Sequence, residues 1–424
     1  MSFLTDPVLR APLIGSMLMC LSSALVGVFV LLRRRSLIGE TLSHAAYPGV
    51  VVSVLVAAAL FPNEKGVALG ALFGAFVAIV LAQLFLSQVT AKLRLKDDAA
   101  LTLTLTGFFG IGVLAASHVQ STHAALFRTV QNFLFGQAAT MRDGHIALYG
   151  GLTLLVIGAM VAFYRPFSLL YFDRSYARSV GVRAPLFDGL FSILLALSIV
   201  IGIRSVGVVL MSAMLIAPAV AARTFTRGLR SLLIVSASLG VACGLGGNLL
   251  SIYLPRWLDQ PQLVLATGPM IVVVGSLLVL ASLLLSPKRG LVARKVKVAR
   301  FRQRCLEENV LKALPQTQMM LRARLGASRL RLLLALYHLR RKGWLRRDLL
   351  ALTSNGEKAA LRLVRLHRLW EVYLVHMGQD AKVVHHSAEE MEHILTPEVE
   401  AQLVTLLDDP THDPHLQPIP EAVL

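Results

Sequence analysis

Two side chains suited to chemistry, a carboxylate and an imidazole, lie inside one apolar segment of the sequence. Glu40 and His44 are four residues apart, so a helix would place both side chains on one face. An ionisable group at membrane depth costs roughly 2.5–3.5 kcal/mol on insertion, and is therefore a candidate for function. A carboxylate oxygen beside an imidazole nitrogen suits Mn, Fe or Zn. The pair predicts an ion pathway; the alternative is a hydrogen bond between packed helices.

A second set of metal-ligating side chains lies near the end of the chain. Eight of the 12 histidines follow residue 337. His367 and Glu371 are four residues apart, and a further group has helical spacing: His385, Glu389, Glu392 and His393. Histidines and carboxylates that converge from two helices can bind Mn or Fe, which accept mixed nitrogen and oxygen ligands. The alternative is a charged helix surface in contact with solvent.

The composition indicates a membrane protein. The chain has 424 residues, of which 55% are hydrophobic, and its mean hydropathy is +0.67. We expect much of the net charge of +18 to lie in cytoplasmic loops rather than on a nucleic-acid-binding face. The three cysteines form no C-x-x-C pair and indicate neither a disulfide framework nor a zinc knuckle.

Nine apolar segments are long enough to cross a bilayer, which takes about 20 helical residues. They are roughly residues 12–32, 41–61, 67–89, 100–117, 145–164, 186–203, 206–223, 230–254 and 267–285. The stretch 124–143 is predicted to be re-entrant or interfacial. The turn at residues 204–205 is too short for an ordinary loop. Lys and Arg gather on one side of the nine spans, which predicts an external N-terminus and a cytoplasmic tail.

The chain changes character near residue 286, where long apolar runs give way to polar, amphipathic helices. This change predicts a mainly α protein with a polytopic membrane domain at residues 1–286, a basic linker at 287–302 and a cytosolic domain at 303–420.

Five blocks of the membrane part, in order, resemble the permease subunits of ATP-binding-cassette importers for manganese, zinc and ferrous iron. They lie at residues 39–49, 134–136, 172–182, 204–219 and 266–271. The resemblance implies a type II-importer-like permease in the plasma (inner) membrane of a prokaryote. It also implies three partners: an ATPase subunit, an extracytoplasmic metal-binding protein and a second permease subunit, either a second copy or a different chain.

The same resemblance assigns roles to residues. Glu40 and His44 correspond to the ion-pathway pair, although the family usually has Asp where this chain has Glu40. Block 172–182 corresponds to the cytoplasmic loop that docks on the ATPase, with these residues as its candidates: Phe172, Asp173, Ala177 and Gly181. A helix N-cap is a second, compatible reading of Asp173. The sequence contains no G-x-x-x-x-G-K-[ST] phosphate-binding loop, so ATP hydrolysis is expected from the separate ATPase and not from this chain.

Residues 303–420 resemble the diphtheria-toxin-repressor family of metal-dependent regulators. The resemblance implies a winged helix at about 303–355 and metal-binding and dimerisation helices at about 356–420. It implies one metal site formed by His367, Glu371 and His385. It implies a second site formed by Glu389, Glu392 and His393 and completed from the first helix of the tail, where this chain has the weak ligand Asn309 in place of Asp or Met.

The supposed recognition helix of the winged helix, residues 328–342, departs from what base reading requires. Reading bases takes polar side chains in the major groove, and this helix is mostly leucine. Its arginines are expected to contact phosphates only, or alternatively anionic lipid headgroups: Arg329, Arg331, Arg340 and Arg341.

The sequence therefore leads to one main hypothesis and one alternative. The main hypothesis is a permease subunit that imports Mn, Zn or Fe and carries a cytosolic metal-sensing domain. No tightly bound cofactor is expected; the divalent ion is the substrate and a regulatory ligand of the tail. The alternative is a metal-dependent transcription regulator, tethered to the membrane or released by cleavage near residues 286–303.

Overall fold

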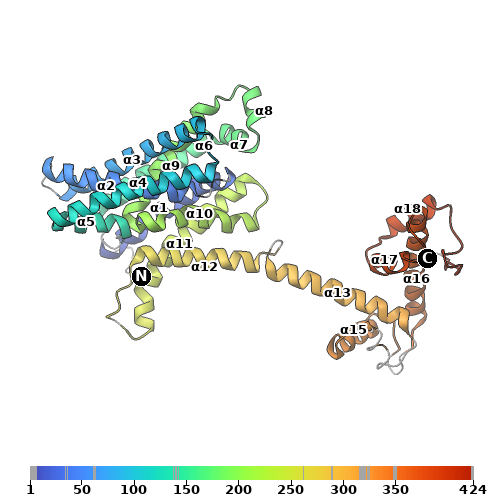
Figure 1. Ribbon diagram of the computed structural model, residues 1–424. Coiled ribbons are helices and arrows are strands. Elements are labelled where there is room, and N and C mark those ends of the chain that lie inside the picture. Colours follow the sequence, from blue (N-terminus) through green and yellow to red (C-terminus); the bar gives the residue numbers. More distant parts are fainter. Residues whose placement is uncertain are drawn as a thin grey trace. The chain divides into compact units, whose positions relative to one another are not determined.

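The computed structural model is mainly helical (Figure 1). It describes residues 7–33, 35, 37–60, 64–136, 138, 141, 143–260, 262–287, 290–314, 321, 325–346 and 351–421. Contacts divide the chain into two compact units, Met1–Ala293 and Arg294–Leu424. The basic stretch predicted as a linker is helical from Leu291 onward, because it forms the start of helix α13, Leu291–Ala313.

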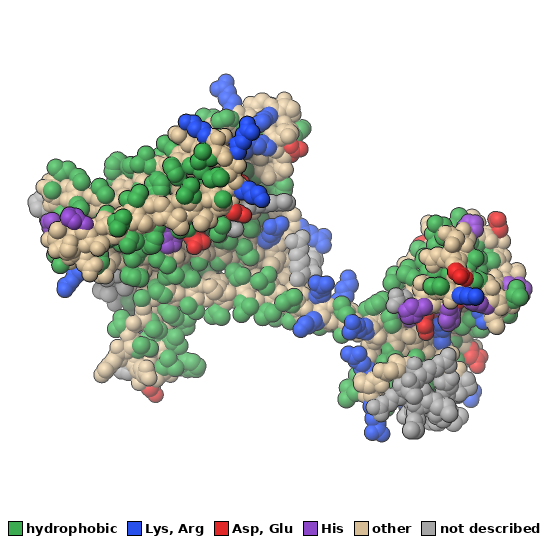
Figure 2. Space-filling model, viewed as in Figure 1, with side chains coloured by type: hydrophobic (Ala, Val, Ile, Leu, Met, Phe, Trp, Pro, Cys, Tyr) green, Lys and Arg blue, Asp and Glu red, His purple; other side chains and the backbone are tan. Residues whose placement is uncertain are grey.

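The predicted fold class is confirmed, since nine helices among the described residues are long and apolar enough to cross a membrane. They are α1 Pro7–Leu32, α2 Ile38–Leu60, α3 Glu64–Lys92, α4 Asp97–Thr122, α6 Asp143–Ala162, α9 Ala184–Val206, α10 Val208–Phe225, α11 Leu229–Trp257 and α12 Thr267–Leu285. Hydrophobic side chains cover much of the visible face of this unit (Figure 2), as expected for helices that face lipid.

Three shorter helices complete the first unit. Helix α5, Ala124–Phe135, has only 12 residues and cannot span a bilayer. It occupies part of the stretch predicted to be re-entrant or interfacial, and it buries Val130 and Phe133. Helices α7, Tyr164–Phe172, and α8, Arg174–Ser179, lie between α6 and α9.

Small residues let the membrane helices approach closely, as is common where lipid tails remove the hydrophobic driving force between helices. A Cβ atom on Gly49 of α2 would lie 2.1 Å from the Gly74 carbonyl oxygen of α3. A Cβ atom on Gly27 of α1 would lie 1.7 Å from the Leu215 carbonyl oxygen of α10. Both positions therefore require glycine, and α1 and α2 can pack at the centre of the unit.

The tight turn near residues 204–205 is made by one residue, Gly207, which separates α9 from α10. Its φ of 93° lies in a region that L side chains rarely adopt. The end of α5 and the start of α12 both pack against this turn. A Cβ atom on Gly136, just after α5, would lie 2.5 Å from the Gly207 nitrogen. A Cβ atom on Gly268, at the start of α12, would lie 3.1 Å from the Ser205 carbonyl oxygen. Three separate sequence blocks thus meet at one backbone junction.

The second unit contains helices and short antiparallel bridges. After α13 come α15 Arg329–Arg341, α16 Ser354–His376, α17 Val384–Met391 and α18 Pro397–Leu406. The bridge between Leu345 and Leu352 lies within the stretch predicted to be a winged helix, about residues 303–355. The end of α13, α15 and the start of α16 share a core of mostly leucine side chains, including Leu311, Leu332 and Leu363.

Candidate metal sites and coupling surface

The first two turns of α2 carry the predicted ion-pathway pair. Glu40 is exposed and His44 is half-buried. The backbone at this point is held by close packing, because a Cβ on Gly39 would lie 2.8 Å from a methyl group of Leu215. The His44 ring stands edge-on to the Phe109 ring, with centroids 4.8 Å apart.

His44 Nδ1 is buried and has no hydrogen-bond partner among the described residues. A buried polar atom without a partner costs free energy, and such atoms are uncommon in native structures. A cation beside His44 and Glu40 would satisfy the imidazole nitrogen and the carboxylate together. The structure thus places the two predicted residues near the start of one helix, with no hydrogen bond to His44 Nδ1 from the described residues.

The predicted coupling segment, residues 172–182, runs from the last residue of α7 through α8 to the turn before α9. Asp173 caps α8, because its Oδ1 accepts from the backbone N–H groups of Ser175 at 3.0 Å and Tyr176 at 2.9 Å. Ala177 is fully buried in a small apolar core with Leu170 and Ala184. This arrangement turns the segment back toward α9.

Gly181 follows α8 at φ 87°, so a positive φ ends the segment. Phe172 is mostly exposed, and so are Tyr176 and Val180 on the neighbouring α8 segment. We call these three side chains the coupling surface. Exposed apolar residues gathered on one short segment are typical of a protein–protein contact.

A charged cluster ties this segment to α1 and α9. Arg33 Nη2 donates to Asp188 Oδ1 at 2.6 Å and to the Tyr171 hydroxyl, and Arg174 Nη2 donates to Asp188 Oδ2 at 2.8 Å. Burial raises the pKa of Tyr171 to about 12 against the opposing effect of the Arg33 guanidinium, so its hydroxyl stays neutral. In Figure 2, Lys and Arg side chains gather in the region of α7 and α8.

The tail brings three predicted ligands together. One ligand atom from each of His367, Glu371 and His385 lies within 4.8 Å of the others. His385 Nδ1 is 2.8 Å from Glu371 Oε1, and His367 Nε2 is 3.0 Å from His385 Nδ1 and 3.1 Å from Glu371 Oε1. An ion about 2.1 Å from each ligand separates its ligands by roughly 3–3.5 Å. The donor set and spacing of these three residues, the α16–α17 triad, fit a divalent transition metal.

The α16–α17 triad opens to solvent on one side. Glu371 and His367 are buried, whereas His385 is exposed. The three side chains line a cavity of about 330 Å³ to which Asn309 and Glu389 also contribute. An ion could therefore enter past His385 and be held by the two buried ligands.

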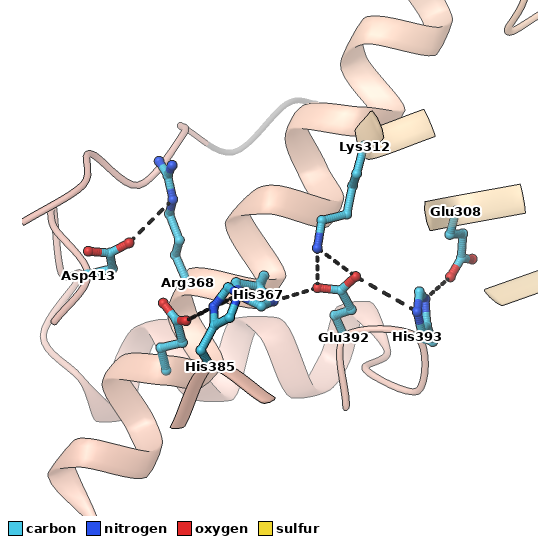
Figure 3. Close-up of polar contacts among 9 residues, drawn as sticks. Glu308, Lys312, His367, Arg368, His385, Glu392, His393 and Asp413 are labelled. Carbon is cyan, nitrogen blue, oxygen red and sulfur yellow. Dashed lines mark hydrogen bonds and ion pairs between the residues drawn. The ribbon is translucent and has the colours of Figure 1, made fainter. Parts of the chain in front are cut away.

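Glu392 and His393 lie beside the triad and contact residues of α13 (Figure 3). Glu392 accepts from Lys312 Nζ at 2.9 and 2.8 Å and contacts His367 Nδ1 at 2.7 Å. His393 Nδ1 lies 2.6 Å from Glu308 Oε2. Burial alone would raise the pKa of Glu392, but the hydrogen bonds from His367 and Lys312 outweigh burial and lower it.

Sequence reasoning missed Lys312 and Glu308. Glu308 likewise has a pKa below its usual value, because hydrogen bonds from His393 and Arg304 outweigh the opposing effect of burial. The available signal was the four-residue spacing of Glu308 and Lys312 on the helix that carries Asn309. Their long-range partners were not readable from that spacing.

The four predicted phosphate- or lipid-contacting arginines lie on α15 and are all exposed: Arg329, Arg331, Arg340 and Arg341. They flank an exposed apolar stripe at helical spacing, formed by Leu330, Leu333, Leu334 and Tyr337. This surface can bind phosphate groups, but its apolar stripe offers bases few polar contacts.

Comparison with known proteins decides the family. The model of the ABC 3 transport family matches residues 5–286, more than half of the chain. The chain belongs to this family. Residues 353–421 also match the iron dependent repressor, metal binding and dimerisation domain. Both resemblances inferred from the sequence are thereby confirmed.

Two curated relatives of this ABC 3 chain extend into the tail. A "Probable metal transport system membrane protein" of Chlamydia trachomatis serovar D is 33% identical over 98% of this chain and 97% of the relative. The "Manganese transport system membrane protein MntC" of Bacillus subtilis strain 168 is 32% identical over 88% of this chain and 85% of the relative. The solved structure of PsaBC from Streptococcus pneumoniae in complex with Fab has a TM-score of 0.57 at 23% identity, over 70% of this chain and 97% of that one, and shares the fold.

Proposed function

We propose that this ABC 3 chain is the membrane permease of an ATP-driven importer of divalent transition metal ions, and that its tail senses the same class of metal in the cytosol. One observation carries the proposal: a single chain presents a histidine–carboxylate pair on a membrane helix and a histidine–carboxylate triad in a domain that matches a metal-binding family. The relatives named for metal or manganese transport support the same class of substrate.

Glu40 and His44 hold the ion on its way through the membrane. The carboxylate supplies charge and the imidazole supplies a nitrogen ligand, a combination suited to Mn, Fe and Zn. The role is supported by His44 Nδ1, which is buried and has no hydrogen-bond partner within the described part of the chain. A second permease subunit, either a second copy or a related chain, completes the pathway from the opposite side.

ATP hydrolysis takes place on a separate ATPase subunit that docks on the coupling surface. Phe172, Tyr176 and Val180 supply the apolar contact, and the Arg33–Asp188 cluster holds the segment against the membrane helices. A rigid segment transmits a movement of the ATPase to α1 and α9. An extracytoplasmic metal-binding protein delivers the ion on the other face.

The tail lies in the cytoplasm of a prokaryote and binds Mn, Fe or Zn at the α16–α17 triad. Imidazole and carboxylate donors bind these ions when both are deprotonated. Because the triad opens to solvent through His385, its occupancy follows the cytosolic metal concentration. The tail thus reports the product of transport to the chain that performs it.

A second candidate function is transcriptional regulation by the tail. It is favoured by the match to a repressor domain and by the exposed arginines of α15. The apolar stripe between those arginines instead favours an anionic lipid surface. A size-resolved blot of cell fractions, with antibodies to each end, distinguishes the two: a free tail fragment that retards DNA only with metal supports the regulator.

Uptake of radioactive manganese tests the main proposal. Cells that express the chain with its ATPase and binding protein should accumulate the ion, and cells that lack only the chain should not. Normal uptake without the chain would overturn the assignment of permease function.

A further inference from the structure

The second metal site expected from the repressor resemblance does not fit the residues present. Glu392 would be its central carboxylate, and only 1% of Glu392 is exposed. Lys312 of α13 places its ammonium 2.9 and 2.8 Å from the two oxygens of that carboxylate (Figure 3). We propose that Lys312 takes the place of the second metal ion, so that the tail binds one ion and holds its second cluster together without metal.

The hydrogen-bond partners of this cluster already occupy both oxygens of Glu392 and the Nδ1 atom of His393. Glu392 Oε1 binds Lys312, and Glu392 Oε2 binds both Lys312 and His367. His393 Nδ1 lies 2.6 Å from Glu308, and Glu308 also accepts from Arg304 at 2.9 Å. A metal ion would have to break these bonds and displace a cation that already neutralises the carboxylate.

Electrostatics opposes a metal ion at the same place. The ammonium and a divalent cation would share one carboxylate at contact distance, where like charges repel strongly in a partly buried site. Lys312 is mostly shielded, with 23% of its side chain exposed, so it cannot easily turn away into solvent. Asn309, the other candidate donor of α13, is neutral and cannot offset the added charge.

The substitution of an ion by an ammonium changes what holds the tail together. Lys312 lies on α13, His367 lies on α16, and Glu392 directly follows α17. The Lys312–Glu392–His367 contacts therefore join three parts of the tail whether or not metal is present. With Nδ1 of His367 facing Glu392, its Nε2 faces the triad, as is usual for a ligating imidazole with a supporting carboxylate.

Metal counting on the purified full-length protein tests this inference, which rests on the proposed metal-binding tail. The protein in detergent is saturated with Mn²⁺, freed of excess ion, and its bound manganese is measured by mass spectrometry. We expect His393→Ala, which removes a predicted ligand of the second site and keeps the Glu392–His367 contact, to keep the wild-type count. We expect His367→Ala with His385→Ala to lose one ion per chain. Loss of one ion in the His393→Ala variant overturns the proposal.

Substitutions of Lys312 supply a second test, in which the protein should gain a bound ion. Lys312→Glu places a carboxylate where the ammonium lies and should add one ion per chain, and this extra ion should vanish when His393→Ala is combined with it. Lys312→Arg, which keeps the positive charge, should keep the wild-type count and serves as the folding control. If the His367→Ala/His385→Ala variant keeps the wild-type number of bound ions, the proposed triad is wrong. The comparison of the Lys312 variants can still be interpreted in that case.

Discussion

Gly136 and Gly207 lie with their backbones in direct contact, although 70 residues separate them in the chain. A Cβ on Gly207 would lie 2.5 Å from the Leu134 carbonyl oxygen, and its φ is 93°. The end of α5 is thereby held against the junction of α9 and α10, and neither glycine can be replaced without moving backbone.

Replacing Gly207 with alanine should destabilise the membrane unit. The strained φ alone costs on the order of 1–3 kcal/mol, and the clash with backbone adds to it. Thermal unfolding in detergent should show a lower midpoint for Gly207→Ala. Gly107→Ala is the matched control, because a Cβ there meets nothing within 4 Å; equal midpoints for the two variants would contradict the packing argument.

Replacing His44 with alanine should abolish metal uptake while the protein still inserts and binds its ATPase. The change removes one nitrogen ligand and hardly alters the hydrophobicity of α2. Radioactive manganese uptake into vesicles measures the effect, with His118→Ala as the control because His118 is an exposed histidine of α4. Wild-type uptake by the His44→Ala variant would show that Glu40 and His44 do not form the ion pathway.

Replacing Gly181 with valine should release the ATPase. A β-branched residue cannot easily adopt the φ of 87° that follows α8, so the coupling surface should shift. Co-purification with the ATPase measures the loss, and Gly189→Val on α9 is the control, since a Cβ there meets nothing within 4 Å. Stoichiometric, stimulated ATPase on the Gly181→Val chain would show that docking occurs elsewhere.

Replacing His367 and His385 with alanine should strongly weaken metal binding by the tail. Loss of a supporting hydrogen-bond partner lowers metal affinity roughly 10–100-fold, and loss of two ligands should lower it further. Binding by the wild type should also weaken below about pH 6, because imidazole ligates only when neutral. Calorimetry on the full chain measures both effects. The control is His376→Ala, which changes an exposed histidine at the end of α16 and should bind as the wild type does. Equal affinity in the double variant would mean that the tail binds metal without the triad.

The stability of the tail should fall in acid through Glu308 and Glu392. Both carboxyls have a folded-state pKa below the ordinary value of 4.5, so their ion pairs contribute fully above pH 4.5. That contribution should be lost as the pH falls from 4.5 through the lower folded-state pKa. Thermal unfolding of the metal-free protein from pH 7 to pH 3 measures the slope, which Glu308→Gln should reduce; an unchanged slope would count against the ion pairs.

The sequence by itself determined the membrane class, the nine spans and the two metal-binding patterns. Each of these depends on local regularities: about 20 apolar residues for a span, and a four-residue spacing that places Glu40 near His44 and His367 near Glu371 on helix faces. The change of composition near residue 286 separated the membrane part from the tail, and the family resemblances assigned a role to each part.

Only the tertiary structure decided which distant groups meet. Lys312 could not be predicted as a partner of Glu392 because the two are 80 positions apart in the chain, and no helical period relates their side chains. The contact of Gly136 with Gly207 and the lack of a partner at His44 Nδ1 depend on packing in the same way. Such contacts arise when helices exclude lipid or water from their shared faces, a balance of close packing and charge pairing that local spacing does not encode.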